Sequence, residues 1–337
     1  MAKKKRKGHY SGIGGQAVIE GIMMKNKDKY SIAVRTPSGD IDVTIEEYDS
    51  FTPSKFLLKI PFIRGIFNFI DSLILGIRTL NYSATFYEEE PKRNREKPRL
   101  FERIFGEYSD KVLSFLTVLF SLVFAIGLFM IAPYFISMLF KNVIVNGTVI
   151  AIIEGLLRVA IFIIYIVAIS AMSDIKRVYK YHAAEHKCIN CLESGRILTV
   201  DNVRKASRLH KRCGTSFMFF VVFVSIVLFM FIRVEDPVMR VVIRLLLLPV
   251  IAGISYEIIR LAGKSNNIIV RILSWPGMML QRLTTCELDG ANETSDGKRY
   301  ADDDIIEVAI SAVDAVFEWR EYLIKEFGYD PSDVYSE

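Results

Sequence analysis

The sequence predicts a mainly α-helical membrane protein with about four transmembrane helices, an interfacial helix, a small N-terminal β-hairpin and a C-terminal amphipathic helix. Two observations predict this class. Of the 337 residues, 51% are hydrophobic and the mean hydropathy is positive, yet the apolar residues are concentrated in long uncharged runs in the middle of the chain. Such runs reach the length of about 20 residues that a helix needs to cross a bilayer. Both ends of the chain are polar, as in segments that lie in water.

These patterns divide the chain into seven segments. They are an N-terminal cytoplasmic glycine-rich segment with a β-hairpin (1–55), an interfacial amphipathic helix (56–87), a charged linker (88–110), transmembrane helices one and two (111–173), a cytoplasmic His/Cys connector with a candidate metal site (174–212), transmembrane helices three and four (213–262), and a cytoplasmic C-terminal region (263–337).

The N-terminal segment begins with a basic run from Lys3 to Lys7, which we expect to anchor on anionic lipid rather than bind nucleic acid. Residues 31–35 and 41–45 alternate between apolar and polar side chains, and residues 37–40 have turn chemistry, which predicts a β-hairpin over 30–47. The glycine-rich run 12–21 lacks the Gly-Lys-Ser/Thr ending of a phosphate-binding loop. We therefore expect it to be tight backbone packed against the hairpin or the membrane.

Residues 56–80 are apolar but carry charges too often for an easy crossing of the bilayer. Apolar residues recur there at helical spacing, so we expect an amphipathic helix on the inner leaflet. Four later runs are expected to span the membrane. They extend from Val112 to Phe140 with a kink near Pro133, from about Thr148 to Met172, between Arg212 and Arg233, and from Arg240 to Arg260 around an uncharged core interrupted by Pro249 and Gly253.

The distribution of basic residues predicts the orientation. The connector 174–212 carries ten Lys and Arg residues, whereas 141–147 carries one and 233–240 carries two. Because short loops rich in Lys and Arg stay in the cytoplasm, we expect a multi-pass protein of the bacterial plasma membrane with both termini and the connector inside. Glu154 and Arg158, four residues apart in the second span, are expected to pair on one helix face.

The connector contains most of the chemistry-bearing residues. His182 and His186 are spaced to project from one face of a helix, which lets two imidazoles chelate one ion. Glu185 completes an H-x-x-E-H pattern, in which the glutamate acts as general base on a metal-bound water. A third ligand is then needed. His210 is the first candidate and Cys213 the second, because both precede the third span and return to the same membrane surface.

Other readings of these residues stay open. Glu193 and Glu257 are further oxygen candidates for the metal. Cys188-x-x-Cys191 followed by His210-x-x-Cys213 could instead close a tetrahedral structural zinc site. The connector could also bind no metal, with its histidines at the lipid interface. The fourth cysteine is Cys286, and in the cytoplasm we expect all four to be thiols or metal ligands rather than disulfides.

At these positions the chain resembles the YqhQ-like family of bacterial membrane proteins, whose members have been described as predicted metal-dependent enzymes. The resemblance covers nearly the whole chain. It is carried by residues 14–24, 60–65, 181–187, 209–217, 255–257 and 280–285. It implies a His/Glu/Cys site without a substrate, and it favours the histidine-centred site over the one built on Cys188. The chain departs from the family pattern at Cys286 and by an apparent insertion over 293–299.

The first hypothesis is therefore a membrane-embedded metal-dependent enzyme. It would be a hydrolase whose site faces the cytoplasm and holds zinc or a related divalent ion. The sequence leaves open whether the protein is an enzyme. The basic connector would favour an anionic substrate. The second is a non-enzymatic assembly factor or regulator with structural zinc, and the third is a small transporter. The amphipathic helix from Ile305 to Phe327 is expected to dock on its own domain or on a protein partner, and no nucleic acid is expected.

Overall fold

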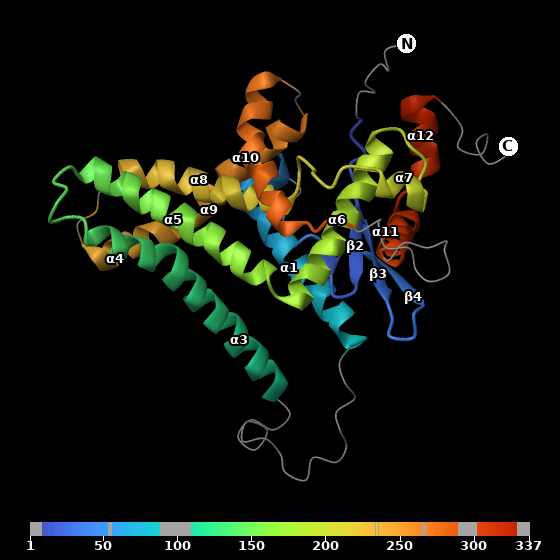
Figure 1. The fold of residues 1–337 in the computed structure, drawn as a ribbon, viewed down its shortest axis with the longest axis horizontal. Helices are drawn as coiled ribbons and strands as arrows, with labels where there is room; N and C mark the ends of the chain where they lie inside the picture. The colour runs from blue at the N-terminus through green and yellow to red at the C-terminus, as the bar shows by residue number, and fades with distance from the viewer. Residues whose placement is uncertain are drawn as a thin grey trace, which may run out of the picture. The chain divides into compact units, whose positions relative to one another are not determined.

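We analysed a computed structural model, which describes residues 9–52, 56–87, 109–232, 234, 236–264, 267–288 and 302–328. The elements, shown in Figure 1, are β1 (Gly14–Val18), β2 (Gly21–Asn26), β3 (Lys29–Arg35), β4 (Ile41–Glu47), the short 3-10 helix η1 (Leu57–Lys59), α1 (Ile63–Thr85), α3 (Ser109–Ile126), the π-helix η3 (Gly127–Ile131), α4 (Ala132–Met138), α5 (Gly147–Ser170), α6 (Ser173–Glu193), α7 (Val200–Arg204), α8 (Gly214–Phe231), α9 (Pro237–Lys264), α10 (Ile268–Thr284), α11 (Asp303–Val316) and α12 (Trp319–Phe327).

The chain forms two compact units. The first, which we call the sheet unit, comprises Met1–Tyr87, Ala168–Phe220 and Ala252–Glu337. The second, which we call the span unit, comprises Glu88–Val167 and Val221–Ile251. Each unit is built from segments that are distant in the sequence, so neither could be recognised as one continuous stretch of chain.

The sheet unit contains a four-stranded antiparallel sheet in the order β1-β2-β3-β4. The predicted hairpin is confirmed as β3 and β4, joined by a turn in which Gly39 has a positive φ of 96°, a conformation that glycine adopts without strain. The glycine-rich run packs against that hairpin, as expected, because β1 and β2 continue the sheet from β3. Residues 14–26 form a second hairpin, β1 and β2, whose apolar residues Val18, Ile22 and Met24 are buried.

Helices cover both faces of this sheet (Figure 1). On one face α6 and α11 pack against β1, β2 and β3 around a core that includes Ile22, Met24 and Ala33. On the other face Leu75 of α1 packs with Val34 and the other buried residues of a smaller core. The expected apolar face of the C-terminal helix is buried against its own chain. Its fully buried members are Ile305, Ile306, Val308, Ala309, Ala312 and Val313.

That C-terminal helix is two helices rather than the single one expected. The first ends at Val316 because Phe317 adopts an extended conformation, with φ −137° and ψ 117°. The second, α12, begins at Trp319, whose indole N–H donates a hydrogen bond to the carboxylate of Asp314 across the break. The break turns Trp319 and Leu323 into the same hydrophobic core as α11.

The four predicted spans are confirmed as helices long and apolar enough to cross a membrane. Among the described residues they are Phe115–Met138, Gly147–Ser170, Gly214–Phe231 and Val238–Ala262. The first continues through η3, whose wider turn lies just before Pro133, and the last contains Pro249. Helix α1 is not among them. Leu73, Ile74 and Ile77 on its outer face are about half exposed, and its place on the inner leaflet stays a prediction.

Two further features were not predicted. The helix expected around His182 and His186 is α6, and it is separate from the second span, because the chain leaves the helix at Ala171 and Met172 before α6 begins at Ser173. The region after the fourth span contains an additional helix, α10, which we did not expect. The basic start (1–8), most of the charged linker (88–108) and the polar segment 289–301 lie outside the described residues.

Candidate metal centre

Helix α6 places three of the predicted site residues on one side of its axis. His182, Glu185 and His186 lie within little more than one helical turn, as their spacing requires. Ala183, Ala184 and Cys188 face the hydrophobic core of the sheet unit and are fully buried. Packing of that apolar face fixes the rotation of α6, which in turn aims the two imidazoles away from the core.

Cys213, the last residue before α8, completes the group. One side-chain atom each from His182, His186 and Cys213 lies within 4.8 Å of the others, a separation suitable for a single metal ion. The Nε2 atom of His182 is 3.1 Å from the Cys213 sulfur, and the centroids of the two imidazole rings are 4.4 Å apart. Among the described residues no other set of three His, Cys, Asp or Glu side chains forms such a group.

Backbone carbonyls orient both imidazoles. The Nδ1 atom of His182 is 2.9 Å from the carbonyl oxygen of Thr284, and that of His186 is 2.6 Å from the carbonyl oxygen of Arg208. A carbonyl oxygen only accepts, so each Nδ1 carries the proton and donates it. In the neutral rings each Nε2 is then left with a lone pair directed at the cluster. Metal-binding histidines have this arrangement, in which the second ring nitrogen donates to a carbonyl or carboxylate.

The electrostatics of the cluster are strongly coupled. Burial alone lowers the pKa of His182, but the charge and hydrogen bond of Cys213 outweigh it and raise that pKa to about 9. Burial alone raises the pKa of the Cys213 thiol, but the adjacent His182 and His186 hold it well below its ordinary value. The site therefore favours a thiolate, which is the form of cysteine that binds metal ions.

Glu185 lies beside the three atoms rather than among them. Its Oε2 atom is 3.7 Å from the Nε2 of His186 and 4.0 Å from the Nε2 of His182. Strand β1 confines it from the other side, because a Cβ atom at Gly15 would lie 2.8 Å from the Glu185 side chain. The carboxylate is buried, with 4% exposure, and it is held next to the position where an ion would sit.

His210 lies near this group without joining it. Its ring centroid is 5.6 Å from that of His186, while its own Nε2 lies 3.2 Å from a nitrogen of Arg212 and 3.9 Å from Glu193. Glu193 also accepts hydrogen bonds from the backbone and side chain of Ser11. Burial raises the pKa of Glu193, but His210, Arg212 and the Ser11 N–H lower it to about 2, so this carboxylate stays charged.

The remaining candidates have other surroundings. Cys188 and Cys191 are fully buried in the hydrophobic core, and the thiol of Cys191 faces the carbonyl oxygen of Ile197 at 3.5 Å. Burial raises the pKa of both thiols, which disfavours a thiolate there. Glu257 forms two hydrogen bonds with Arg64, of 2.7 and 2.5 Å. None of the four cysteines, all of which lie within the described residues, forms a disulfide.

Sequence reasoning included residues 280–285 among the stretches that carry the family resemblance, but it gave them no role in the site. The side chain of Gln281, on α10, accepts from the N–H of His210 at 2.8 Å and donates to the carbonyl of His210 at 2.6 Å. It also donates to the hydroxyl of Ser216 at 2.7 Å. Three residues later Thr284 supplies the carbonyl that orients His182. Gln281 and Thr284 near the end of a mainly apolar helix were the available signal, but their partners lie about 70 and 100 residues away in the sequence.

Comparison with known proteins gives the family. Residues 60–319 match the model described as "Protein of unknown function (DUF1385)". The chain belongs to this family. It is also 35% identical over 275 residues to the protein named "Uncharacterized protein YqhQ" of Bacillus subtilis (strain 168), covering 81% of this chain and 86% of that protein. No solved structure matches the chain. The DUF1385 match includes His182, Glu185, His186, Cys213, Gln281 and Thr284.

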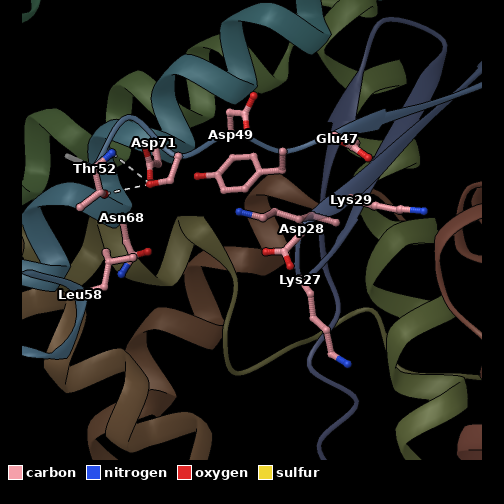
Figure 2. A pocket seen from close by; sticks show the side chains of 12 residues that line it. Lys27, Asp28, Lys29, Glu47, Asp49, Thr52, Leu58, Asn68 and Asp71 are labelled. Carbon is pink, nitrogen blue, oxygen red and sulfur yellow. Dashed lines mark hydrogen bonds between the residues drawn. The ribbon is translucent and has the colours of Figure 1, made fainter. Parts of the chain in front are cut away.

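A separate polar cavity of about 750 Å³ lies in the sheet unit, between the β2–β3 turn and the start of α1. Figure 2 shows charged side chains of both signs around it, including Lys27, Asp28 and Asp71. Asp71 accepts hydrogen bonds from the hydroxyl of Ser50 at 2.5 Å and the N–H of Phe51 at 2.8 Å. These hydrogen bonds connect the loop before η1 to α1. With its charges mixed in this way, the cavity favours no ligand of one sign.

Proposed function

We propose that this protein binds one divalent metal ion, most suitably zinc, through His182, His186 and Cys213 and that it is a metal-dependent hydrolase. The observation that carries the proposal is the convergence of two Nε2 atoms and one thiolate, with both imidazoles oriented by backbone carbonyls. Three protein ligands of nitrogen and sulfur are the set that catalytic zinc sites use, because the fourth position stays open for water or substrate.

Each residue has a role in this proposal. A bound ion would act as a Lewis acid that lowers the pKa of a water molecule toward neutrality. Glu185, close to both Nε2 atoms but outside the ligand set, would be the general base at this site. His210 is not a metal ligand in this proposal. It helps to position the segment that carries Cys213, through Gln281 and Glu193.

The position of the site in the chain supports work at the membrane surface. Cys213 directly precedes the span Gly214–Phe231, so the site lies within one residue of a membrane-crossing helix. Arg208, Lys211 and Arg212 lie in the same short segment and favour an anionic substrate. The basic connector supports the cytoplasmic side for the site and for both termini.

Metal analysis of the purified full-length protein tests the ligand set. We expect about one zinc ion per chain after incubation with zinc and gel filtration. His182→Ala and Cys213→Ser should lose it. His9→Ala and Cys286→Ser, which remove the same side chains outside the group, should retain it. Wild-type protein without metal, or His182→Ala with full occupancy, would contradict the proposal.

Glu185→Gln separates catalysis from a structural role. The variant keeps the shape of the side chain, so it should still bind zinc but lose hydrolysis of ester, amide and phosphoester substrates by at least 100-fold. The competing function, a scaffold with structural metal, is favoured by the burial of His186 and Cys213, which come from two different segments of the chain. That function predicts a large fall in Tm on zinc removal and no turnover by the wild type across the whole substrate panel.

A further inference from the structure

The span unit contains a charged cluster within its membrane-crossing helices. Arg158 and Glu154 of α5 form an ion pair of 2.9 Å, and Arg244 of α9 approaches the same Glu154 oxygen to 2.6 Å. All three residues are buried, with 5–6% exposure. Charged side chains inside spans are costly, and they are retained where they pair with one another or with a ligand.

Every span contributes to this cluster. The Nε of Arg158 donates to the carbonyl of Phe129 at 3.1 Å, and Phe129 lies in the π-helix η3, where backbone hydrogen bonding is altered. The hydroxyl of Ser225 on α8 lies 3.4 Å from another Arg158 nitrogen. Both guanidinium groups also lie over the ring of Phe229, at 5.1 and 4.8 Å. The cluster is therefore a built site rather than a chance surface pair.

The charges of this cluster do not balance. Among the described residues, Glu154 is the only acidic side chain that forms an ion pair with either arginine, so two guanidinium groups share one carboxylate. Arg240 lies one helical turn before Arg244 on α9 and adds a further positive charge, with its Nε donating to the carbonyl of Val234 at 2.8 Å. A buried excess of positive charge is stabilised by an anion.

The cluster lies near the ends of its helices, which shortens the path that such an anion must take from water. Glu154 and Arg244 each lie seven residues from the start of their helices, and Ser225 lies six residues from the end of α8. At 1.5 Å per residue, each of these positions is about 10 Å from the end of its helix. Because a bilayer core is about 30 Å thick, a group entering from that end needs to pass only the outer third.

We propose that Arg158 and Arg244 form a binding site for a phosphate-type oxyanion, because the single Glu154 carboxylate offsets only one of the two guanidinium charges. A guanidinium presents a rigid fork of N–H donors that matches the oxygens of phosphate. The phosphate group of an anionic lipid and free phosphate offer the same chemistry to this site. The inference is independent of the metal centre, because it uses other residues and another unit.

The test uses the full-length protein in a maltoside detergent, which contains no phosphate. One series adds phosphatidylglycerol and a second adds inorganic phosphate at constant ionic strength. Thermal unfolding measures stabilisation, and native mass spectrometry counts retained lipid. We expect one anion per chain. Retention of the lipid alone identifies a headgroup site, whereas stabilisation by phosphate alone identifies a site for a soluble anion.

Two variants with opposite expected effects on anion binding locate the site. Arg244→Gln removes the excess charge and should weaken anion binding at least tenfold. Glu154→Gln removes the competing carboxylate and should strengthen it. Arg260→Gln, which removes one charge from the other end of α9, should bind as the wild type does. The proposal is overturned if neither anion binds the wild type, or if both Arg244→Gln and Glu154→Gln bind with wild-type affinity. Anion binding by the wild type tests the proposal even if a variant fails to fold.

Discussion

At the scale of single residues, the candidate site depends on how closely β1 approaches α6. Gly15 leaves room for the Glu185 side chain, and its neighbour Gly14 has open space where a side chain would be. Two adjacent glycines therefore have different structural roles. The sequence showed the glycine-rich run, but only the packing distinguishes the glycine that contacts the site from the one that does not.

Gly15→Ala should therefore destabilise the protein and disturb the metal centre. The added Cβ would lie 2.8 Å from Glu185, from the Met24 sulfur and from the backbone oxygen of Met23, which cannot easily move. Overpacking of this kind costs about 1–3 kcal/mol. We expect a lower Tm and weaker zinc retention for Gly15→Ala and no change for Gly14→Ala. Equal behaviour of the two variants would show that β1 does not confine Glu185.

At the scale of elements, α10 acts as a support for the metal centre. One side of the helix presents Gln281 and Thr284 to the segments that carry His182 and His210, while Ile272 and Trp275 are more than half exposed. This separation of polar and apolar positions along α10 was not recognised from the sequence, where residues 263–337 were expected to be a cytoplasmic C-terminal region. Support from α10 explains why the segment 208–213 has a defined position despite having no regular structure before α8.

Gln281→Met should show this support directly. Methionine fills a similar volume but removes three hydrogen bonds, which leaves buried polar groups of His210 and Ser216 without their partner. Each unsatisfied buried group costs about 1–3 kcal/mol. We expect a fall in Tm and a weakened affinity for zinc. Arg282→Met, on the exposed side of the same helix, should change neither by a measurable amount.

At the scale of the whole molecule, the chain alternates between the sheet unit and the span unit. Unit boundaries fall inside α5, α8 and α9, near Val167, Phe220 and Ile251, so membrane helices belong in part to each unit. This arrangement ties the candidate metal centre to the bilayer through Cys213 and α8. The orientation of the spans therefore fixes which compartment the candidate metal centre faces.

Cysteine labelling of intact bacterial cells tests the orientation. In a Cys286→Ser background, Val145→Cys places a thiol in the loop between α4 and α5, where Val145 is 98% exposed. Asp201→Cys places one in the basic connector, at a side chain that is 73% exposed. A membrane-impermeant maleimide should label the first in intact cells and the second only after permeabilisation. The reverse pattern would place the metal centre outside the cytoplasm.

The sequence by itself determined the features that depend on near neighbours. Each span follows from a long apolar run with few charges, because the favourable free energies of moving its apolar side chains into lipid add up along a continuous segment. The β3–β4 hairpin follows from alternation around a turn, and the pairing of Glu154 with Arg158 from their spacing of four. The common orientation of His182 and His186 has the same local origin, since both lie on one turn of α6.

Only the tertiary structure decided which distant residues meet. It brings Cys213 to the two imidazoles and sets His210 beside Glu193 and Arg212. It buries Cys188 and Cys191 in the core, and it adds Arg244 to the pair in α5. These residues are separated by tens of positions, and their approach depends on how whole helices pack against the sheet and against one another. Such packing depends on the complementary shapes of helix and sheet surfaces, so the spacing of residues along the sequence does not predict it.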